Sequence, residues 1–286
     1  MVQNVQNGEI LALADSDEIA AGSDEAKMNV SRAVSQTFEP GSIGKVISMS
    51  GYLQTGLRKP TDQYTVPGQL TVDGQTYKDA FEHGDEHWTL AGILQKSSNI
   101  GMVMAGDGYT DEQRYEYLTK FGIGQSTGLD LPGESSGVLT SPSSWDARTR
   151  NTVLFGQGGY TVNALQLSNI VATIANKGVK QQQSIIKSDD GNTENKSKAT
   201  RVVDEQVAAQ MMDAMESVSD SYSAFIKVDG YRMAAKSGTA EVQGADGKLS
   251  SIISDYSVAI PADNPRFVVT VVLKDPTGFG GLTAGP

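Results

Sequence analysis

The stretch FEPGSIGKVISMSGYLQTG, residues 38–56, predicts a turn followed by a helix with one apolar face. Pro40 and Gly41 favour the turn. The apolar residues that follow recur near helical spacing: Val46, Ile47, Met49 and Leu53. Ser42 and Lys45 lie three residues apart on the first turn of this helix, so their side chains can meet. The lysine is unexpected there, because the N-terminus of a helix disfavours positive charge.

Two interpretations of this pair stay open at the level of the motif. In the first, Ser42 is a helix N-cap and Lys45 is an exposed residue of the first turn. In the second, the Ser42 hydroxyl is a nucleophile and Lys45 is its base, because burial and the helix dipole both favour a neutral amine. The choice depends on partners elsewhere in the chain.

Composition excludes several classes of protein. The chain has 286 residues, no cysteine and a formal net charge of −11. Without cysteine there is no disulfide framework, thiolate nucleophile or sulfur-ligated zinc site. The acidic balance argues against nucleic acid or an anionic membrane surface as a partner. No run of about 18 apolar residues occurs, and residues 1–20 lack the order of a signal peptide. We therefore expect any targeting segment to lie outside this chain.

The middle of the chain is predicted to be mostly helical. Asn7-Gly8 first predicts a hairpin, residues 16–36 a polar loop with room for a short helix, and residues 57–86 an irregular or hairpin-like region. Thr110 and Gln113 form a capping-box pattern. Residues 180–200 are polar and of low complexity, which predicts a surface loop. Helices are expected from Ser42, at Trp88–Lys96, at Ile100–Ala105, after Thr110, at residues 163–178 and at Val203–Val218.

The periodicity changes to that of strands near the C-terminus. YRMAAKSGTAEV, DYSVAI and RFVVTVVL, which start at residues 231, 255 and 266, predict three strands. Strand signals at both ends with helices between them predict an α+β fold. We expect an antiparallel sheet flanked by helices, built from about residues 1–40 and 200–286, with a mostly helical lobe inserted at about 41–199.

Two further segments could complete a site with Ser42. KSSNIG, residues 96–101, falls at a junction between helices, and AAKSGTAEV, residues 234–242, places a glycine inside a strand pattern. Glycine in a strand interior is unfavourable unless a backbone or ligand must come close. Taken singly, each segment is more simply a turn or a solvated strand. Taken together, the order S-x-x-K, S-x-N, K-S-G-T is far more specific.

With these motifs, the chain resembles a class B penicillin-binding protein, of the superfamily that includes the serine β-lactamases. The resemblance extends through RAVSQTFEPGS, KFGIGQSTGLDLPGE, LQLSNIVATIANKGV and PADNPRFVVTVVL, and so over nearly the whole chain. It implies a peptidoglycan D,D-transpeptidase domain with its site between the sheet and the helical lobe. It departs from the family at Ile43-Gly44, where Thr-Phe is usual, which removes bulk beside the site.

The resemblance implies a role for each motif residue. Ser42 would be the acylated nucleophile, Lys45 its general base and Ser97 the proton relay. Asn99, Lys236, Ser237, Gly238 and Thr239 would bind substrate, and the N–H groups of Ser42 and Thr239 would form the oxyanion hole. No cofactor or metal is implied. A serine-type transpeptidase of this kind would be acylated by D-Ala-D-Ala stem peptides and by β-lactams.

Other functions on the same fold stay open. These are a β-lactam or muropeptide sensor domain, an idle scaffold of the division or elongation machinery, a D,D-carboxypeptidase and a serine β-lactamase. A class A β-lactamase needs a deacylating Glu in an E-x-x-L-N context, and the sequence has none.

The resemblance also implies a setting for the chain. We expect a place at the extracytoplasmic face of the bacterial membrane, an N-terminal anchor outside this chain, and partners in a cell-wall synthesis complex. We expect a fragment shortened at both ends, without the long C-terminal helix of the family. That predicts an exposed apolar strip from alternate residues of Phe267–Leu273.

His83 and His87, with Glu86 between them, have a spacing seen in zinc sites. Gly84 and Asp85 argue against the helix that such a site needs, so structural or surface roles are expected. The glycine-rich segments FGQGGY and GFGG lack the pattern of a nucleotide site and are expected to be turns bordering the cleft.

Overall fold

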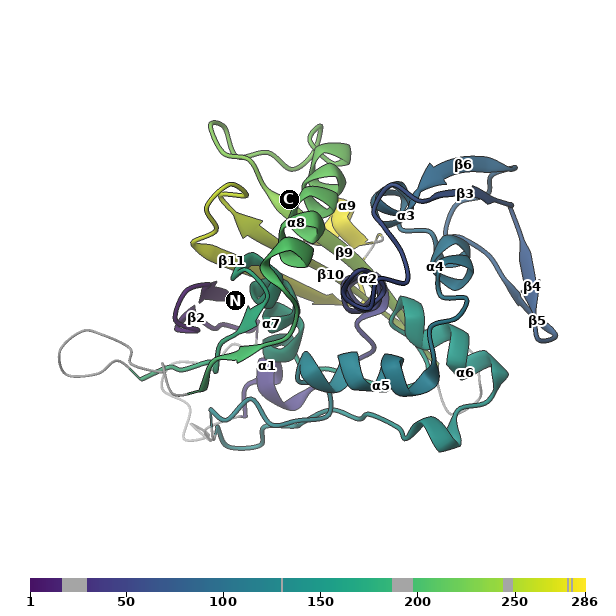
Figure 1. Cartoon of the computed structure of the whole chain (residues 1–286). Coiled ribbons are helices and arrows are strands. Elements are labelled where there is room, and N and C mark those ends of the chain that lie inside the picture. The colour runs from purple at the N-terminus through teal and green to yellow at the C-terminus, as the bar shows by residue number, and fades with distance from the viewer. Residues whose placement is uncertain (17–29, 130, 187–197, 244–248, 277, 279) are drawn as a thin grey trace.

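The computed structural model describes residues 1–16, 30–129, 131–186, 198–243, 249–276, 278 and 280–286. Its centre is a five-stranded antiparallel sheet in the order β2-β1-β11-β10-β9 (Figure 1). The strands are β1 (Val2–Asn4), β2 (Ile10–Ala12), β9 (Ala234–Gln243), β10 (Leu249–Ile260) and β11 (Phe267–Lys274). The two ends of the chain thus build one sheet, and β9 lies at its edge.

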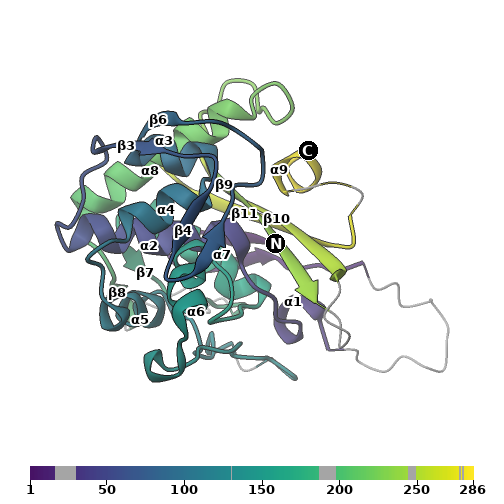
Figure 2. The ribbon, with the colours of Figure 1, turned by 90° about the vertical axis from the view of Figure 1, so that its right-hand side faces the viewer.

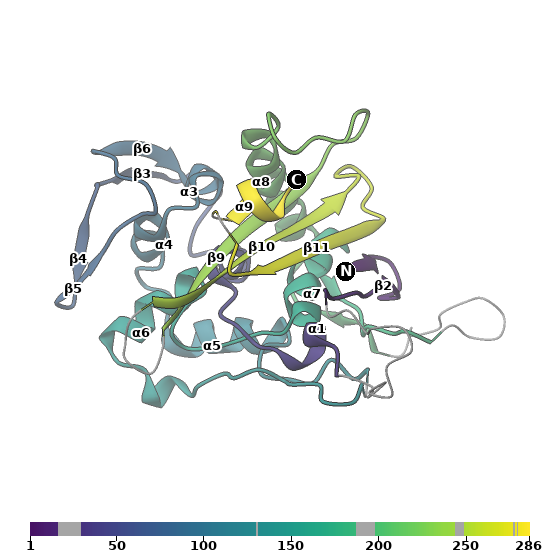
Figure 3. The ribbon, with the colours of Figure 1, turned by 180° about the vertical axis from the view of Figure 1, so that it is seen from behind.

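Helices cover the two faces of the sheet unequally. On one face, α7 (Ala164–Ala175) packs on β10 and β11 while α8 (Glu205–Ser221) packs on β9. The opposite face carries only the short helix α9 (Gly280–Ala284) among the described residues, over β9 and β10 (Figure 3). Helix α9 is not predicted from the sequence. On β11, Phe267 and Val271 are each 37% exposed, which confirms the predicted apolar strip at these two positions. The prediction is wrong at Val269 and Leu273, which are half-buried; Leu273 packs against the cluster that includes Ala284 of α9.

The chain between β2 and β9 forms the helical region. Figure 2 shows α2, α3, α4 and α5 on one side of the sheet and α9 on the other. A two-stranded antiparallel sheet of β3 and β6 and a hairpin of β4 and β5 extend from this region. The elements are α1 (Arg32–Ser35), α2 (Gly44–Gln54), β3 (Gln63–Val66), β4 (Leu70–Val72), β5 (Gln75–Tyr77), β6 (Glu86–Thr89), α3 (Leu90–Lys96), α4 (Asn99–Ala105), α5 (Asp111–Lys120), α6 (Ala147–Thr152), β7 (Val179–Lys180) and β8 (Thr200–Arg201).

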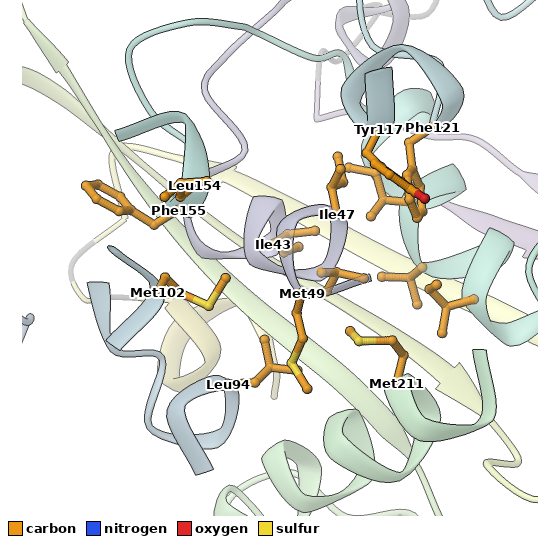
Figure 4. Packing of buried hydrophobic residues seen from close by; sticks show 14 of the residues in the cluster. Ile43, Ile47, Met49, Leu94, Met102, Tyr117, Phe121, Leu154, Phe155 and Met211 are labelled. Atoms are coloured by element: carbon orange, nitrogen blue, oxygen red, sulfur yellow. The ribbon is translucent and has the colours of Figure 1, made fainter. Parts of the chain in front are cut away.

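Helix α2 is the centre of the core. Every residue from Gly44 to Leu53 is buried, so the helix is enclosed on all sides rather than on one face. Ile43 and Met49 are fully buried and pack among side chains of neighbouring helices (Figure 4). Since the core fixes this helix, it also fixes the residues at its N-terminus.

Most of the predicted elements are confirmed. The hairpin at Asn7-Gly8 joins β1 to β2, and Thr110 and Gln113 form the capping box of α5. The helix predicted at Trp88–Lys96 is wrong at its start: Trp88 pairs with Tyr64 in the two-stranded β3–β6 sheet, and the helix begins only at Leu90. Parts of two predicted loops, residues 17–29 and 187–197, lie outside the described residues.

Close approach of three backbone segments places the start of α2 against the sheet. Gly41 has φ +50°, and its N–H donates to Gly156 O at 3.1 Å. A Cβ on Gly41 would lie 2.4 Å from Thr239 O. A Cβ on Gly156, where φ is +91°, would lie 1.7 Å from Gly41 O. Glycine is therefore required at both positions, and FGQGGY does border the turn before α2.

Replacing Gly156 by alanine tests this packing. The control is Gly74→Ala, also at positive φ (+74°) but with no atom within 4 Å of the added Cβ. The control bears only the strain of a left-handed conformation, about 1–2 kcal/mol. Gly156→Ala also displaces the Gly41 turn, so its loss of unfolding free energy in urea should be larger by about 1–3 kcal/mol. Equal losses would contradict the packing described.

Candidate active site

Ser42 is held in a 3-10 turn that leads into α2. The turn comprises Gly41–Ile43, and the N-cap of α2 is Ile43, which makes no side-chain capping bond. The interpretation of Ser42 as the N-cap of this helix is therefore wrong. Its hydroxyl lies instead 2.8 Å from Lys45 Nζ. The structure thus joins the two side chains whose spacing first suggested a nucleophile and its base.

Lys45 is fully buried and lies between two serines. Its Nζ is 2.8 Å from Ser42 Oγ, 2.5 Å from the carbonyl oxygen of Ser97 and 3.2 Å from Ser97 Oγ. Burial holds the pKa of Lys45 well below its usual range; the positive charge of Lys236 lowers it further, while Asp79 opposes the shift. Loss of a proton leaves a lone pair on Nζ, so this amine can accept the hydroxyl proton of Ser42.

Ser97 occupies a left-handed position between α3 and α4. Its φ is +56°, and its N–H donates to Leu94 O at 3.1 Å. A serine in this conformation costs about 1–2 kcal/mol, so the surrounding contacts must stabilise it. Ser97 Oγ lies 3.2 Å from Lys45 Nζ and accepts a hydrogen bond from Lys236 Nζ at 2.9 Å. One hydroxyl therefore links the two lysines.

Lys236 is the second buried lysine, on the edge strand β9. Burial lowers its pKa to about 7, and the carboxylate of Asp255 on β10 opposes that shift. Asp255 is paired across the strands with Gly238, two residues from Lys236, so the two charged side chains are on the same face of the sheet. Burial also raises the pKa of Asp255 well above its usual range, against the effect of Lys236.

Strand β9 presents the K-S-G-T segment to the turn that carries Ser42. A Cβ on Gly238 would lie 2.6 Å from Pro40 O and 2.2 Å from Asp255 Oδ1, which explains the glycine inside this strand. Ser237 Oγ is 3.2 Å from Tyr222 Oη. Because β9 is an edge strand, some of its peptide groups face away from β10, and Thr239 packs directly on Gly41.

Asn99 begins helix α4 beside Ser97. Its side-chain amide donates to Lys78 O at 3.2 Å, and its backbone N–H donates to Asp79 Oδ1 at 2.6 Å. The structure thus gathers Ser42, Lys45, Ser97 and Lys236 into one chain of contacts. Asn99 lies two residues after Ser97, with its side-chain amide on Lys78 O, and Ser237, Gly238 and Thr239 follow Lys236 on β9.

The departure at Ile43-Gly44 has a structural counterpart. A Cβ on Gly44 would lie 2.3 Å from Tyr160 Oη and 2.7 Å from Gly156 Cα. The expectation that Gly44 removes bulk beside the site is therefore incomplete, because the Tyr160 hydroxyl and the Gly156 backbone fill that space.

Three residues around the motifs were not found from the sequence. Asp79 lies in a stretch without helical or strand periodicity, and Asp255 looks like an outward-facing residue of a strand. Tyr222 belongs to the end of α8. Each of the three contacts a segment that is distant in sequence, and motif spacing does not reveal such contacts. Only Asp255 had a weak sequence clue, because it is the single charged residue of the strand LSSIISDYSVAI.

The two histidines take separate partners. His87 Nδ1 is 3.0 Å from Thr65 Oγ1, and His83 Nε2 is 3.0 Å from Asp79 Oδ2. Within the described ranges, no group of three or more His, Asp or Glu side chains is arranged to hold a metal ion.

Comparison with known proteins assigns the family. The model of the penicillin binding protein transpeptidase domain matches residues 1–286. The chain belongs to this transpeptidase family. Peptidoglycan D,D-transpeptidase FtsI of Escherichia coli is 32% identical over 295 residues, covering 99% of this chain and 48% of that protein. The chain spans about half the length of the curated relatives it matches.

Solved structures of the family have the same fold. A peptidoglycan synthetase from Bifidobacterium adolescentis is 69% identical, with a TM-score of 0.92 over 100% of this chain and 54% of that one. Penicillin-binding protein 3 from Mycobacterium tuberculosis, complexed with ampicillin, is 33% identical, with a TM-score of 0.84 over 96% of this chain and 65% of that one. The fold is the predicted one, a mixture of helices with an antiparallel sheet.

The electrostatic coupling of Asp255 to Lys236 can be measured directly. Asp255→Asn removes the carboxylate that opposes the effect of burial on Lys236, so the lysine pKa should fall below about 7. The measurement is a pH titration of the Lys236 Cε chemical shift in protein labelled with 13C-lysine. Asp275→Asn, which removes an exposed carboxylate after β11, is the control. An unchanged or higher pKa for Lys236 in Asp255→Asn would refute the coupling.

Proposed function

We propose that this chain is the catalytic domain of a peptidoglycan D,D-transpeptidase, which forms an acyl-enzyme on Ser42. The observation that carries the proposal is the contact of Ser42 Oγ with the Nζ of a fully buried lysine at 2.8 Å. A buried, uncharged amine within hydrogen-bond distance of a hydroxyl is the arrangement that activates a serine. The name of the E. coli relative supports the same reaction.

Acylation follows from the positions of the three catalytic residues. Lys45 Nζ accepts the proton of the Ser42 hydroxyl while Ser42 Oγ forms a bond to the carbonyl carbon of the penultimate D-alanine. The tetrahedral oxyanion is stabilised by the N–H groups of Ser42 and Thr239, each worth about 2.7–4 kcal/mol of barrier. The proton then passes from Lys45 through the Ser97 hydroxyl to the leaving nitrogen. Cleavage of that C–N bond releases D-alanine.

Substrate binding falls to the residues around this chain of contacts. The positive charge of Lys236, together with the hydroxyls of Ser237 and Thr239, binds the terminal carboxylate of the donor peptide. Gly238 leaves room for a neighbouring backbone to approach β9 closely. The side-chain amide of Asn99 holds the substrate amide. In the second half-reaction, an amine of a neighbouring stem peptide attacks the acyl-enzyme, loses a proton along the reverse path and frees Ser42.

Acylation by β-lactams follows from the same chemistry. The ring amide of a β-lactam presents a strained carbonyl next to a carboxylate, the two groups that this site binds. The ampicillin complex of the M. tuberculosis protein supports this inference. A sensor domain or idle scaffold would also be acylated by β-lactams, whereas a β-lactamase would release the product quickly and a carboxypeptidase would use water as acceptor.

The setting of the enzyme is part of the proposal. Its curated relatives are penicillin-binding proteins and peptidoglycan transpeptidases, which supports a catalytic domain on the extracytoplasmic side of the membrane. We propose partners in a cell-wall synthesis complex and an anchor outside residues 1–286. Among the described residues, no helix has both the length and the apolar character needed to cross a bilayer.

Mass spectrometry with benzylpenicillin tests the nucleophile. The wild-type chain should gain the mass of one penicilloyl group, located on the peptide that contains Ser42. Ser42→Ala should abolish the adduct, and Lys45→Ala should slow its formation by at least about 10²-fold, because a positioned base is lost.

The time course separates the alternatives in the same experiment. The adduct of a transpeptidase should persist on a timescale far longer than β-lactamase turnover. A full adduct on Ser42→Ala would move the nucleophile elsewhere. Rapid loss of the wild-type adduct, with release of penicilloic acid, would make the chain a β-lactamase.

A further inference from the structure

The segment between β5 and β6 lies against the turn that carries the S-x-N motif. Asp79, in this segment, is 9% exposed in its side chain and forms four contacts with its two carboxylate oxygens. Oδ1 accepts the N–H of Asn99 at 2.6 Å and of Ile100 at 3.0 Å. Oδ2 accepts the Ser98 hydroxyl at 2.6 Å and lies 3.0 Å from His83 Nε2. No role in the reaction proposed above uses this carboxylate.

The contacts of Asp79 fix the backbone on which two site residues are carried. The N–H groups of Asn99 and Ile100 begin helix α4 and have no intrahelical acceptor. Ser98, fully buried, donates to Asp79 and accepts the N–H of Gly101 at 2.8 Å. The residue before this clamp is Ser97, in its left-handed conformation. With the next residues held, the Ser97 hydroxyl stays between the two lysines.

His83 completes the clamp through both nitrogens of its ring. Nδ1 is 2.7 Å from Gly84 O, and Nε2 is 3.0 Å from the Asp79 carboxylate. Both partners are acceptors, so only the doubly protonated ring donates to both. The hydrogen bond to Gly84 O raises the pKa of His83, and Asp79 adds to the shift. The ring also lies against Trp88, with centroids 5.2 Å apart.

We propose that Asp79 is a positioning residue of the acylation step, which holds Ser97 and Asn99 in place from behind, with His83 as its partner. This proposal rests on the function proposed above. It assigns no contact with substrate to Asp79. Displacement of a catalytic group by about 1 Å can cost on the order of 10²-fold in rate, so loss of the clamp should act on the chemical step.

The test compares Asp79→Ala with a control that removes an equivalent clamp elsewhere. Glu134 accepts bonds from the hydroxyl of Ser126 and from the N–H and hydroxyl of Thr127, in a turn that has no part in the site. Stopped-flow acylation by benzylpenicillin gives the rate constant of acylation and the dissociation constant of the initial complex separately. Asp79→Ala should lower the rate constant by about 10²-fold and change the dissociation constant by less than about threefold.

Two further variants sharpen the result. Asp79→Asn keeps an acceptor oxygen for the two N–H groups, so it should retain the rate within about tenfold of wild type. Glu134→Ala should leave the rate within about threefold. Equal rate losses in Asp79→Ala and Glu134→Ala would mean that Asp79 contributes only to stability, which would overturn the proposal. An unchanged rate in Asp79→Ala would overturn it as well.

A second readout does not depend on acylation. In the free protein, Asp79→Ala should speed hydrogen exchange at the Asn99 and Ile100 amides and shift the Cε signal of Lys236, which Glu134→Ala should not do. The Lys45 signal is not used, because loss of the Asp79 charge alone lowers the pKa of Lys45. If wild-type protein is not acylated, the proposed function fails, and these signals still decide whether Asp79 positions Ser97. Unchanged signals in Asp79→Ala would exclude that role.

Discussion

Two lysines, Lys45 and Lys236, are buried on either side of the Ser97 hydroxyl, and the chemistry of the site depends on that burial. Desolvation disfavours an ammonium group, and two neighbouring ammonium groups disfavour each other. The surroundings then decide which lysine keeps its charge. The Asp255 carboxylate on β10 raises the pKa of Lys236, whereas the charge of Lys236 lowers the pKa of Lys45 by more than Asp79 raises it. In the proposed mechanism, this asymmetry suits Lys45 to act as the base and Lys236 to act as the cation that binds a carboxylate.

The fold brings these side chains together by close backbone approach. Gly41 packs on the peptide group of Thr239, and Gly156 packs against Gly41. Gly238 leaves room for the carbonyl oxygen of Pro40. Each contact would be blocked by a single Cβ. The edge position of β9 leaves this side of the sheet open to the helical region, whose central helix α2 is enclosed by the core. A rigid sheet and a buried helix thus meet at Ser42, the proposed nucleophile.

Sequence patterns predicted what depends on local spacing. The pair Ser42 and Lys45, the capping box at Thr110 and the strands of the C-terminal sheet all follow from residues close in the chain. Contacts between distant segments could not be predicted in this way. Asp79 reaches across 20 residues to Asn99, and Trp88, taken as helical, is held in a strand by pairing with Tyr64. In both cases a tertiary partner, rather than local propensity, determines the structure.

Exchange of the terminal residue of a stem peptide measures acyl transfer most directly. The protein is incubated with a pentapeptide that ends in D-Ala-D-Ala and with deuterated D-alanine as the amine acceptor, and the peptide mass is followed over time. A transpeptidase that works through Ser42 incorporates the labelled D-alanine, and Ser42→Ala does not. Formation of only the shortened tetrapeptide would show hydrolysis instead of transfer. Absence of any product, from protein that penicillin acylates at Ser42, would contradict the enzymatic role and favour a sensor or scaffold.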